Sequence, residues 1–176
     1  PAEVEAARRK YFGCEEKRMW NLAWWADPIA FGKYPEEGLE NFGDMVPKFT
    51  EADMQLIAEP IDYLAFNCYS GGRVKADADG KKAREATTQR GLSVAPDAIY
   101  WATRWQTERY QLPIVISENG LCNTDWVHLD GKVHDSQRID FMHRYLAAIE
   151  RSIGDGADVA GYFYWSILDN FEWAEG

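Results

Sequence analysis

Hydrophobic side chains recur at helical spacing in four stretches of the sequence, and each stretch predicts a helix. The predicted helices cover residues 2–22, 51–59, 96–110 and 135–153. The last of them carries an apolar stripe that we expect to face the core, formed by Ile139, Met142, Leu146, Ile149 and Ile153. Thr50 with Asp53 three residues later predicts a capping box at the start of the second helix.

Three apolar runs predict strands, at residues 61–69, 113–117 and 158–168. Two intervening stretches lack a regular pattern. Residues 24–38 are interrupted by Pro and Gly and are predicted to be a loop or an ordered connector, and residues 70–93 are polar, charged and glycine-bearing, which predicts a long surface loop.

Strands that alternate with helices predict an α/β fold, with a parallel sheet covered on both faces. Three strands are too few for a complete doubly wound sheet or for a closed barrel of eight. Each strand nevertheless ends in polar or aromatic groups, namely Asn67 and Tyr69, Glu118 and Asn119, then Trp165, Asp169, Glu172 and Trp173. Ligands bind at the carboxyl ends of parallel strands, so we expect these groups to converge on one site.

Composition narrows the class of partner. The 176 residues are 46% hydrophobic and 14% aromatic, with more rings than a core of this size needs, so a surface that stacks on a ligand is expected. The formal charge of -10 disfavours nucleic acid and anionic membranes and favours a neutral partner. Other aromatics are expected to be structural or to pack in the core, namely Trp20, Trp24, Trp101, Trp105, Tyr162, Phe163 and Tyr164.

Cysteines and histidines predict neither a metal site nor a cofactor. Cys14, Cys68 and Cys122 are odd in number and widely spaced, so they form neither a zinc motif nor a complete disulfide framework and are expected to be reduced thiols. The three histidines show no ligand spacing. No membrane span or signal peptide is apparent, so a cytoplasmic location is expected, although the start at Pro1 inside a helical pattern leaves the natural amino-terminus open.

Two carboxylates carry the candidate chemistry. Glu118 ends an apolar run, where a plain turn residue would be the ordinary expectation, and Glu172 lies between Phe171 and Trp173. A carboxylate among aromatic rings is typical of a group that binds a polyhydroxylated ligand or transfers a proton. Two carboxylates that face a cleft lined by Trp are the arrangement of a glycoside hydrolase, in which one is the nucleophile and the other the acid.

The segments WWADPIAFGKYP, PIDYLAFNCY, ISENG and GYFYWSILDNFEWAEG resemble, in this order and spacing, the second half of a family 1 glycoside hydrolase. This is the β-glucosidase and β-galactosidase family. The resemblance implies that residues 1–176 are the carboxy-terminal portion of a single (β/α)8 barrel domain. About three βα units would be present, and the amino-terminal strands and a final segment would be absent.

The resemblance also implies residue roles. Glu118 would be the nucleophile that forms a glycosyl-enzyme intermediate, Tyr69 would hydrogen-bond it, and Asn67 would be the polar residue beside it. Glu172 would bind sugar hydroxyls, so it would not be the acid that its position suggests, while Trp165 would lie under the sugar ring and Trp173 would donate its indole N–H to a hydroxyl.

The family's general acid lies in an Asn-Glu-Pro motif that this sequence lacks, and Glu59 in Ala58-Glu59-Pro60 matches a different segment. We therefore expect a retaining β-glycosidase portion that is inactive alone and needs a complementary amino-terminal chain or the remainder of its polypeptide. A non-catalytic carbohydrate-binding or scaffold fragment and an inert degradation product are the alternatives. Glucosides and galactosides are not distinguished.

Overall fold

A computed structural model of the protein describes residues 2–15, 18–74 and 87–175, which form two compact units. A helical unit comes from residues 1–62 and 73–81, and a sheet unit from residues 63–72 and 82–176. Pro1, which the sequence places in a first helical turn, and residues 75–86 of the predicted surface loop lie outside the described residues.

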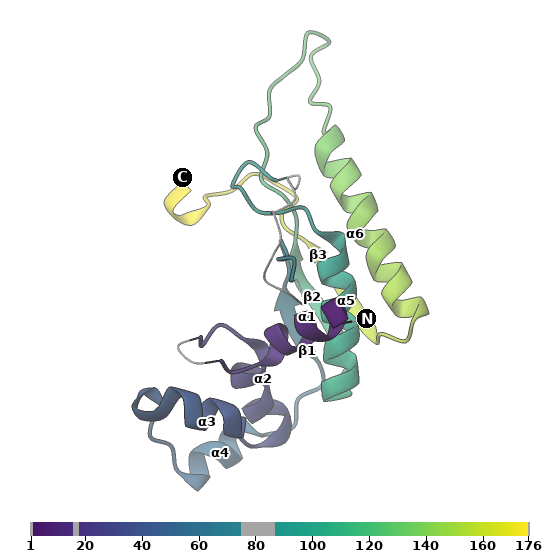
Figure 1. The fold of residues 1–176 in the computed structure, drawn as a ribbon. Coiled ribbons are helices and arrows are strands. Elements are labelled where there is room, and N and C mark those ends of the chain that lie inside the picture. Colours follow the sequence, from purple (N-terminus) through teal and green to yellow (C-terminus); the bar gives the residue numbers. More distant parts are fainter. Residues whose placement is uncertain (1, 16–17, 75–86, 176) are drawn as a thin grey trace. The chain divides into compact units, whose positions relative to one another are not determined.

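The helical unit contains α1 (Ala2–Phe12), α2 (Leu22–Phe31), α3 (Glu36–Phe42), the 3-10 turn η1 (Gly43–Met45) and α4 (Glu51–Ile57) (Figure 1). Trp24 is buried there, with its ring centroid 4.5 Å from that of Tyr34 and 4.8 Å from that of Phe42. The predicted capping box is confirmed, because Asp53 N donates to Thr50 Oγ1 and Thr50 N donates to Asp53 Oδ2.

Two predictions for this unit are wrong. The helix expected over residues 2–22 ends at Phe12, and the loop expected over residues 24–38 is largely helical, in α2 and α3. Asn21 caps α2 by accepting a hydrogen bond from Trp24 N at 2.9 Å. The cap and the burial of Trp24 outweigh the local signal of Pro28, which lies inside α2, and Gly32 ends that helix with a positive φ of 70°.

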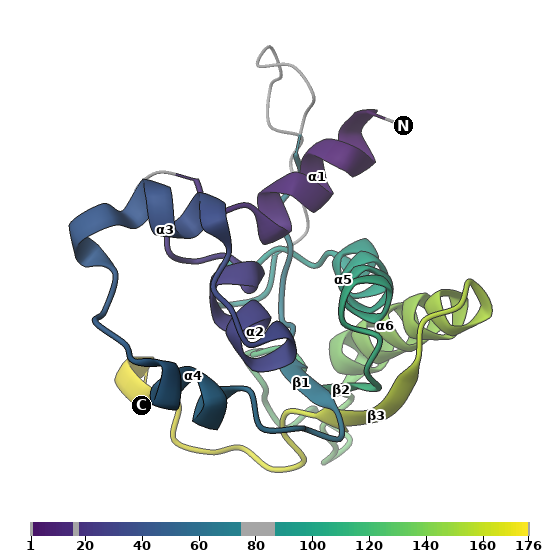
Figure 2. The same ribbon diagram turned by 90° about the horizontal axis from the view of Figure 1, so that it is seen from below.

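The sheet unit is built on three parallel strands, β1 (Leu64–Asn67), β2 (Ile114–Asn119) and β3 (Val159–Tyr164), in the order β1-β2-β3. Helices α5 (Pro96–Tyr110) and α6 (Ser136–Gly154) connect them, and the short helix η2 (Trp173–Glu175) follows. Figures 1 and 2 show α5 and α6 side by side along the sheet. The predicted parallel α/β arrangement is confirmed.

The core of the sheet unit lies between β2 and these two helices. Ile99 of α5, Ile116 of β2 and Tyr145 of α6 are fully buried in it, and Phe141 stacks on Tyr145 with 4.1 Å between ring centroids. Both helices therefore cover one face of the sheet. On the opposite face, Ala65 and Phe163 are exposed within this unit, so coverage of both faces is not observed in the sheet unit itself.

The stripe predicted to bury α6 is displaced. Of the predicted residues, Ile149 is buried as expected and Met142 is half-buried, whereas Ile139, Leu146 and Ile153 are exposed. The other buried residues of α6 are Phe141, Tyr145, Ala148 and Ser152. The buried stripe is the one that packs against α5 and β2, and its two aromatic rings remove a large apolar area from water.

Some of the remaining aromatic side chains are buried and others are exposed. Trp105 is buried and stacks on Trp101, with 5.3 Å between centroids, as expected of structural residues. Trp20 and Phe163 are exposed, so the core packing expected of Phe163 is wrong and the described residues do not enclose Trp20 as they would a structural side chain. Phe163 is exposed because it lies on the face of the sheet away from α5 and α6. Within the residues that the structure describes, no helix combines the length and the apolar character needed to cross a membrane.

Candidate active site

A β-bulge at the end of β2 determines where Glu118 lies. Leu64 pairs with Ile114 and Phe66 with Ile116, but the next residue of β1, Asn67, pairs with Glu118, so β2 contains one extra residue. Strand side chains alternate between faces, and an unbroken strand would place Glu118 on the helix-covered face after Ile116. The extra residue moves Glu118 to a half-buried position at the strand end.

Because of the bulge, Asn119 and not Glu118 lies at the buried position at the end of β2. Its side chain is fully buried, with 0% exposure, and Nδ2 donates to the Cys68 carbonyl at 2.7 Å. The Tyr162 hydroxyl donates to Asn119 Oδ1 at 2.8 Å. Asn119 therefore joins the chain after β1 to β3 across the end of β2, a structural role that the sequence did not reveal.

Tyr69 follows β1 and donates its hydroxyl to Glu118 Oε2. The backbone supports this contact, because Cys68 N donates to the Glu118 carbonyl at 2.8 Å. Burial is the largest of several causes that raise the pKa of Tyr69, followed by its hydrogen bond to Glu118 and the charges of Glu118 and Glu172. The phenol therefore remains a protonated donor at neutral pH.

Asn67 lies beside Glu118 across the β1–β2 pair. Its Oδ1 accepts a hydrogen bond from Ser117 Oγ at 2.8 Å, which fixes the amide at the exposed end of the strands. Ser117 is one of the two β2 residues at the bulge, so the bulge supplies the partner that orients Asn67.

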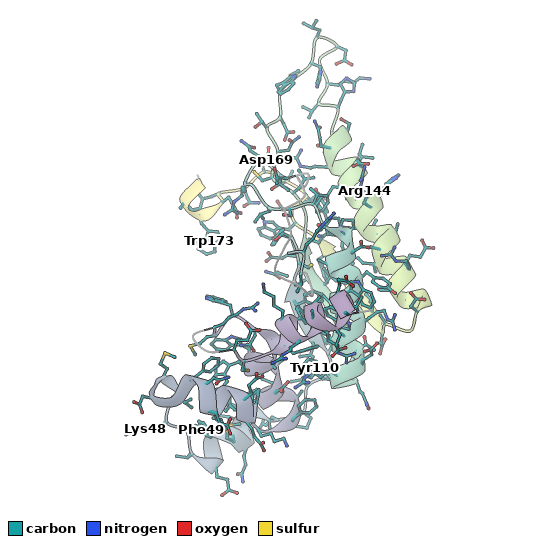
Figure 3. The ribbon with its side chains drawn as sticks, in the orientation of Figure 1. Lys48, Phe49, Tyr110, Arg144, Asp169 and Trp173 are labelled. Atoms are coloured by element: carbon teal, nitrogen blue, oxygen red, sulfur yellow. The ribbon has the colours of Figure 1, made fainter. Side chains whose placement is uncertain are left out.

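The segment after β3 approaches β2 closely. Trp165 N donates to the Asn119 carbonyl at 2.9 Å, and a cis peptide bond joins Trp165 to Ser166. Ser166 Oγ then donates to the Leu168 carbonyl at 2.6 Å and accepts from Asn170 Nδ2 at 2.7 Å. These bonds join residues 166, 168 and 170 to one another, and Asp169 (Figure 3) lies in the same segment, three residues before Glu172.

A cavity of about 440 Å³ lies at this end of the sheet unit, within the size range of small-molecule sites. Of the residues predicted for the site, Tyr69, Trp165 and Glu172 line it, as does Asp169. Glu118 contacts this wall through the Tyr69 hydroxyl. An aromatic ring, carboxylates and a phenol in one cavity are suited to a ligand with an apolar face and several hydroxyls.

Arg90 is a cavity residue that sequence reasoning missed. Its Nη1 lies 2.5 Å from Glu172 Oε1, and Thr88 and Gln89 line the cavity beside it. These residues belong to the part of the predicted surface loop that the structure describes. No periodic pattern marks these residues in the sequence, because they form a turn, and the contact of Arg90 with Glu172 is made across 82 positions.

Arg138 also lines the cavity, and its charge is balanced by two carboxylates. Nη2 lies 2.7 Å from Asp125 and Nη1 lies 2.5 Å from Asp135. The hydrogen bond to Asp125 is the largest cause that raises the pKa of Arg138. Among the described residues, no three His, Cys, Asp or Glu side chains are grouped as metal ligands would be.

Trp173 is not brought to the cavity. Its side chain is 81% exposed and projects from η2 near the end of the chain (Figure 3). Glu59, the glutamate set aside in the sequence, follows α4 of the helical unit and is exposed. The structure thus groups Tyr69, Glu118, Trp165 and Glu172, with Asn67 beside Glu118, and leaves Trp173 outside the group.

Comparison with known proteins gives one consistent family. The model of the family described as Glycosyl hydrolase family 1 matches residues 5–176. The chain is 39% identical over 164 residues to beta-glucosidase A of Thermotoga maritima, covering 89% of this chain and 36% of that protein. It is 39% identical over the same length to a 1,4-beta-D-glucan glucohydrolase of Thermotoga neapolitana, covering 89% of this chain and 38% of that protein.

Solved structures give the same result. A beta-glucosidase from Thermotoga maritima in complex with castanospermine matches with a TM-score of 0.78 and 38% identity, over 88% of this chain and 36% of that one. The same enzyme in complex with galacto-hydroximolactam matches with a TM-score of 0.79 and 38% identity, over 89% and 37%. The likeness confirms the predicted fold class, part of an α/β barrel, and the chain spans little more than a third of these relatives.

Proposed function

Because the chain belongs to glycosyl hydrolase family 1, we propose that it supplies the nucleophile and part of the sugar site of a retaining β-glycosidase. The substrates would be terminal β-D-glucosides or galactosides. The observation that carries the proposal is the placement of Glu118, which the bulge turns out of the core and which Tyr69 holds beside a cavity lined by Trp165 and Glu172.

In the proposed reaction, one Glu118 oxygen attacks the anomeric carbon of the bound sugar. The bond from that carbon to the leaving oxygen breaks, and the leaving group takes a proton from a general acid. A water molecule, deprotonated by the same acid/base group, then attacks the anomeric carbon and releases the sugar and the Glu118 carboxylate. Tyr69 donates to Glu118 and orients it for attack.

The remaining proposed contacts are with the sugar. Trp165 offers an aromatic face to the apolar side of the ring, and Glu172 accepts hydrogen bonds from sugar hydroxyls. Asn67, fixed by Ser117, lies beside the nucleophile. For Trp173 we retain the proposal of an indole hydrogen bond to a hydroxyl, which requires η2 to be held differently when the rest of the site is present.

We propose that the acid/base group comes from an amino-terminal chain or segment, since the sequence has no Asn-Glu-Pro motif. The sheet supports this, because β1 and β3 are its edges and Phe163 is exposed on one face. Edge strands and exposed apolar faces associate with other elements. We call the 176-residue chain together with such an amino-terminal half the reconstituted enzyme.

Covalent trapping tests the proposal. A fluorinated β-glucoside that forms a slowly hydrolysed intermediate should add one glycosyl mass to the reconstituted enzyme, on the peptide that contains Glu118. Glu118→Gln should abolish the added mass and preserve sugar binding. Glu59→Gln is the matched change in an exposed glutamate, and this variant should still gain the glycosyl mass. Binding without any added mass would reject the enzyme and support a carbohydrate-binding module.

A further inference from the structure

Arg90 is held toward the cavity by a tight turn. Thr87 and Ser93 form an isolated antiparallel bridge, Thr88 N donates to the Leu92 carbonyl and Gly91 N to the Thr88 carbonyl, each at 2.9 Å. Gly91 adopts a positive φ of 73°, which favours glycine. The turn therefore presents Arg90 to the cavity from a defined backbone, next to Glu172.

Arg90 and Glu172 form an ion pair on the cavity wall. Arg90 Nη1 lies 2.5 Å from Glu172 Oε1, and both residues line the cavity. A guanidinium carries five N–H donors and a carboxylate about four acceptor positions, so such a pair can bind each other and a ligand hydroxyl at the same time. A sugar hydroxyl both donates and accepts, and the pair offers it an acceptor and a donor side by side.

Thr88 gives an independent indication of a polar ligand on this wall. It is only 9% exposed and lines the same cavity, and its Oγ1 has no hydrogen-bond partner among the described residues. A buried hydroxyl without a partner is costly, and a ligand that enters the cavity can satisfy it.

We propose that Arg90 is a substrate-binding residue that recognises, jointly with Glu172, a hydroxyl of the sugar. Arg90 donates to the hydroxyl oxygen, and the hydroxyl donates to Glu172. The turn that carries Arg90 and Thr88 thereby completes the polar wall of the sugar site. This inference rests on the proposed glycosidase function and extends it to a residue outside the strand-end motifs.

The test measures kcat and KM of the reconstituted enzyme with an aryl β-glucoside. Arg90→Met should raise KM by about tenfold or more, since a hydrogen bond to a charged group is lost, and should change kcat by less than about threefold. Arg90→Lys keeps the charge without the planar fork and should give an intermediate KM. Arg144→Met is the matched control, because Arg144 is an exposed α6 residue paired with Asp140 (Figure 3).

Two further measurements separate recognition from a structural effect. In a Glu172→Gln background, Arg90→Met should change KM by less than about twofold, because the pair acts as a unit. A panel of monodeoxy aryl β-glucosides, each lacking one sugar hydroxyl, identifies the hydroxyl that is bound. Removal of that hydroxyl should raise the KM of the unmodified enzyme until it equals the KM of Arg90→Met. An unchanged or lower KM for both Arg90 variants, relative to Arg144→Met, overturns the inference.

Failure of the proposed function has a different signature. In that case the unmodified reconstituted enzyme neither hydrolyses the aryl glucoside nor is trapped at Glu118, and both proposals are rejected together. If the unmodified enzyme is active and Arg90→Met behaves as Arg144→Met does, the glycosidase proposal stands and the role of Arg90 alone is rejected.

Discussion

A Cβ atom added to Gly120 would lie 1.9 Å from the carbonyl oxygen of Trp165. The residue after β2 and the residue after β3 are thus in backbone contact, and the hydrogen bond from Trp165 N to the Asn119 carbonyl lies beside this contact. Gly120 ends the segment that contains Glu118, and Trp165 begins the segment that leads to Glu172. The close approach sets the distance between the two sides of the candidate site.

We predict that Gly120→Ala forces these backbones apart. The free energy of unfolding should fall by about 1–3 kcal/mol, as for other overpacked sites, and kcat/KM of the reconstituted enzyme should fall with it. Urea denaturation followed by circular dichroism measures the first effect. Gly154→Ala is the control, since a Cβ there meets no atom within 4 Å. Equal denaturation midpoints for the two variants would contradict the steric account.

Asn119 gives a second prediction, which concerns stability. Asn119→Ala removes the partners of the buried Cys68 carbonyl and of the half-buried Tyr162 hydroxyl, so the free energy of unfolding should fall by roughly 2 kcal/mol or more. Tyr162→Phe removes the hydroxyl that donates to Asn119, and it should lower the free energy of unfolding by about 1 kcal/mol. The double variant should cost less than the sum of both, because the hydrogen bond they share is lost only once.

Periodic features of the sequence predicted the strands and the two long helices of the sheet unit. The helix expected over residues 96–110 matches α5 to the residue, and the parallel strands follow from apolar runs that alternate with helices. The capping box of α4 was also predictable, because Thr50 and Asp53 are three residues apart and form a local motif. Such features depend on neighbours along the chain.

Features that depend on distant partners were not predictable. The β2 strand was expected to end at Ser117, and the bulge that carries it to Asn119 is visible only in the pairing with β1 and β3. The contact of Arg90 with Glu172 joins residues 82 positions apart. The α6 stripe was misplaced because two apolar stripes are adjacent and only packing against α5 selects between them.

Tyr69→Phe tests the hydrogen bond to Glu118. A hydrogen bond to a charged group contributes about 1.5–3 kcal/mol, so kcat/KM of the reconstituted enzyme should fall by about tenfold to a hundredfold. The loss should be smaller than that of Glu118→Gln, which removes the nucleophile itself. Tyr63→Phe, which changes an exposed tyrosine of the same unit, serves as the control. An unchanged rate for Tyr69→Phe would contradict the assigned orientation of Glu118.

Alkaline pH should destabilise the sheet unit through Tyr145, which is buried, and Tyr162, which is half-buried. Burial raises the pKa of Tyr145 and of Tyr162 to about 12, from an ordinary value of 10.0. The folded state therefore favours the protonated phenols. Their stabilising contribution is fully present below pH 10 and is lost as the pH rises from about 10 through 12. Denaturation at several pH values should show this decline, and Tyr162→Phe should decline less steeply; equal slopes would contradict the contribution of Tyr162.

Alkylation of cysteine should distinguish the cavity wall from the core. Cys122 is exposed and lines the cavity, whereas Cys14 and Cys68 are buried, and burial raises the pKa of the Cys68 thiol to about 12. Because the thiolate is the reactive form, iodoacetamide should modify Cys122 first in the folded reconstituted enzyme. Peptide mass spectrometry identifies the site. The adduct should narrow the cavity and raise KM for an aryl glucoside, and Cys122→Ala should prevent both changes. Earlier modification of Cys68 would show that the core opens before the cavity wall reacts.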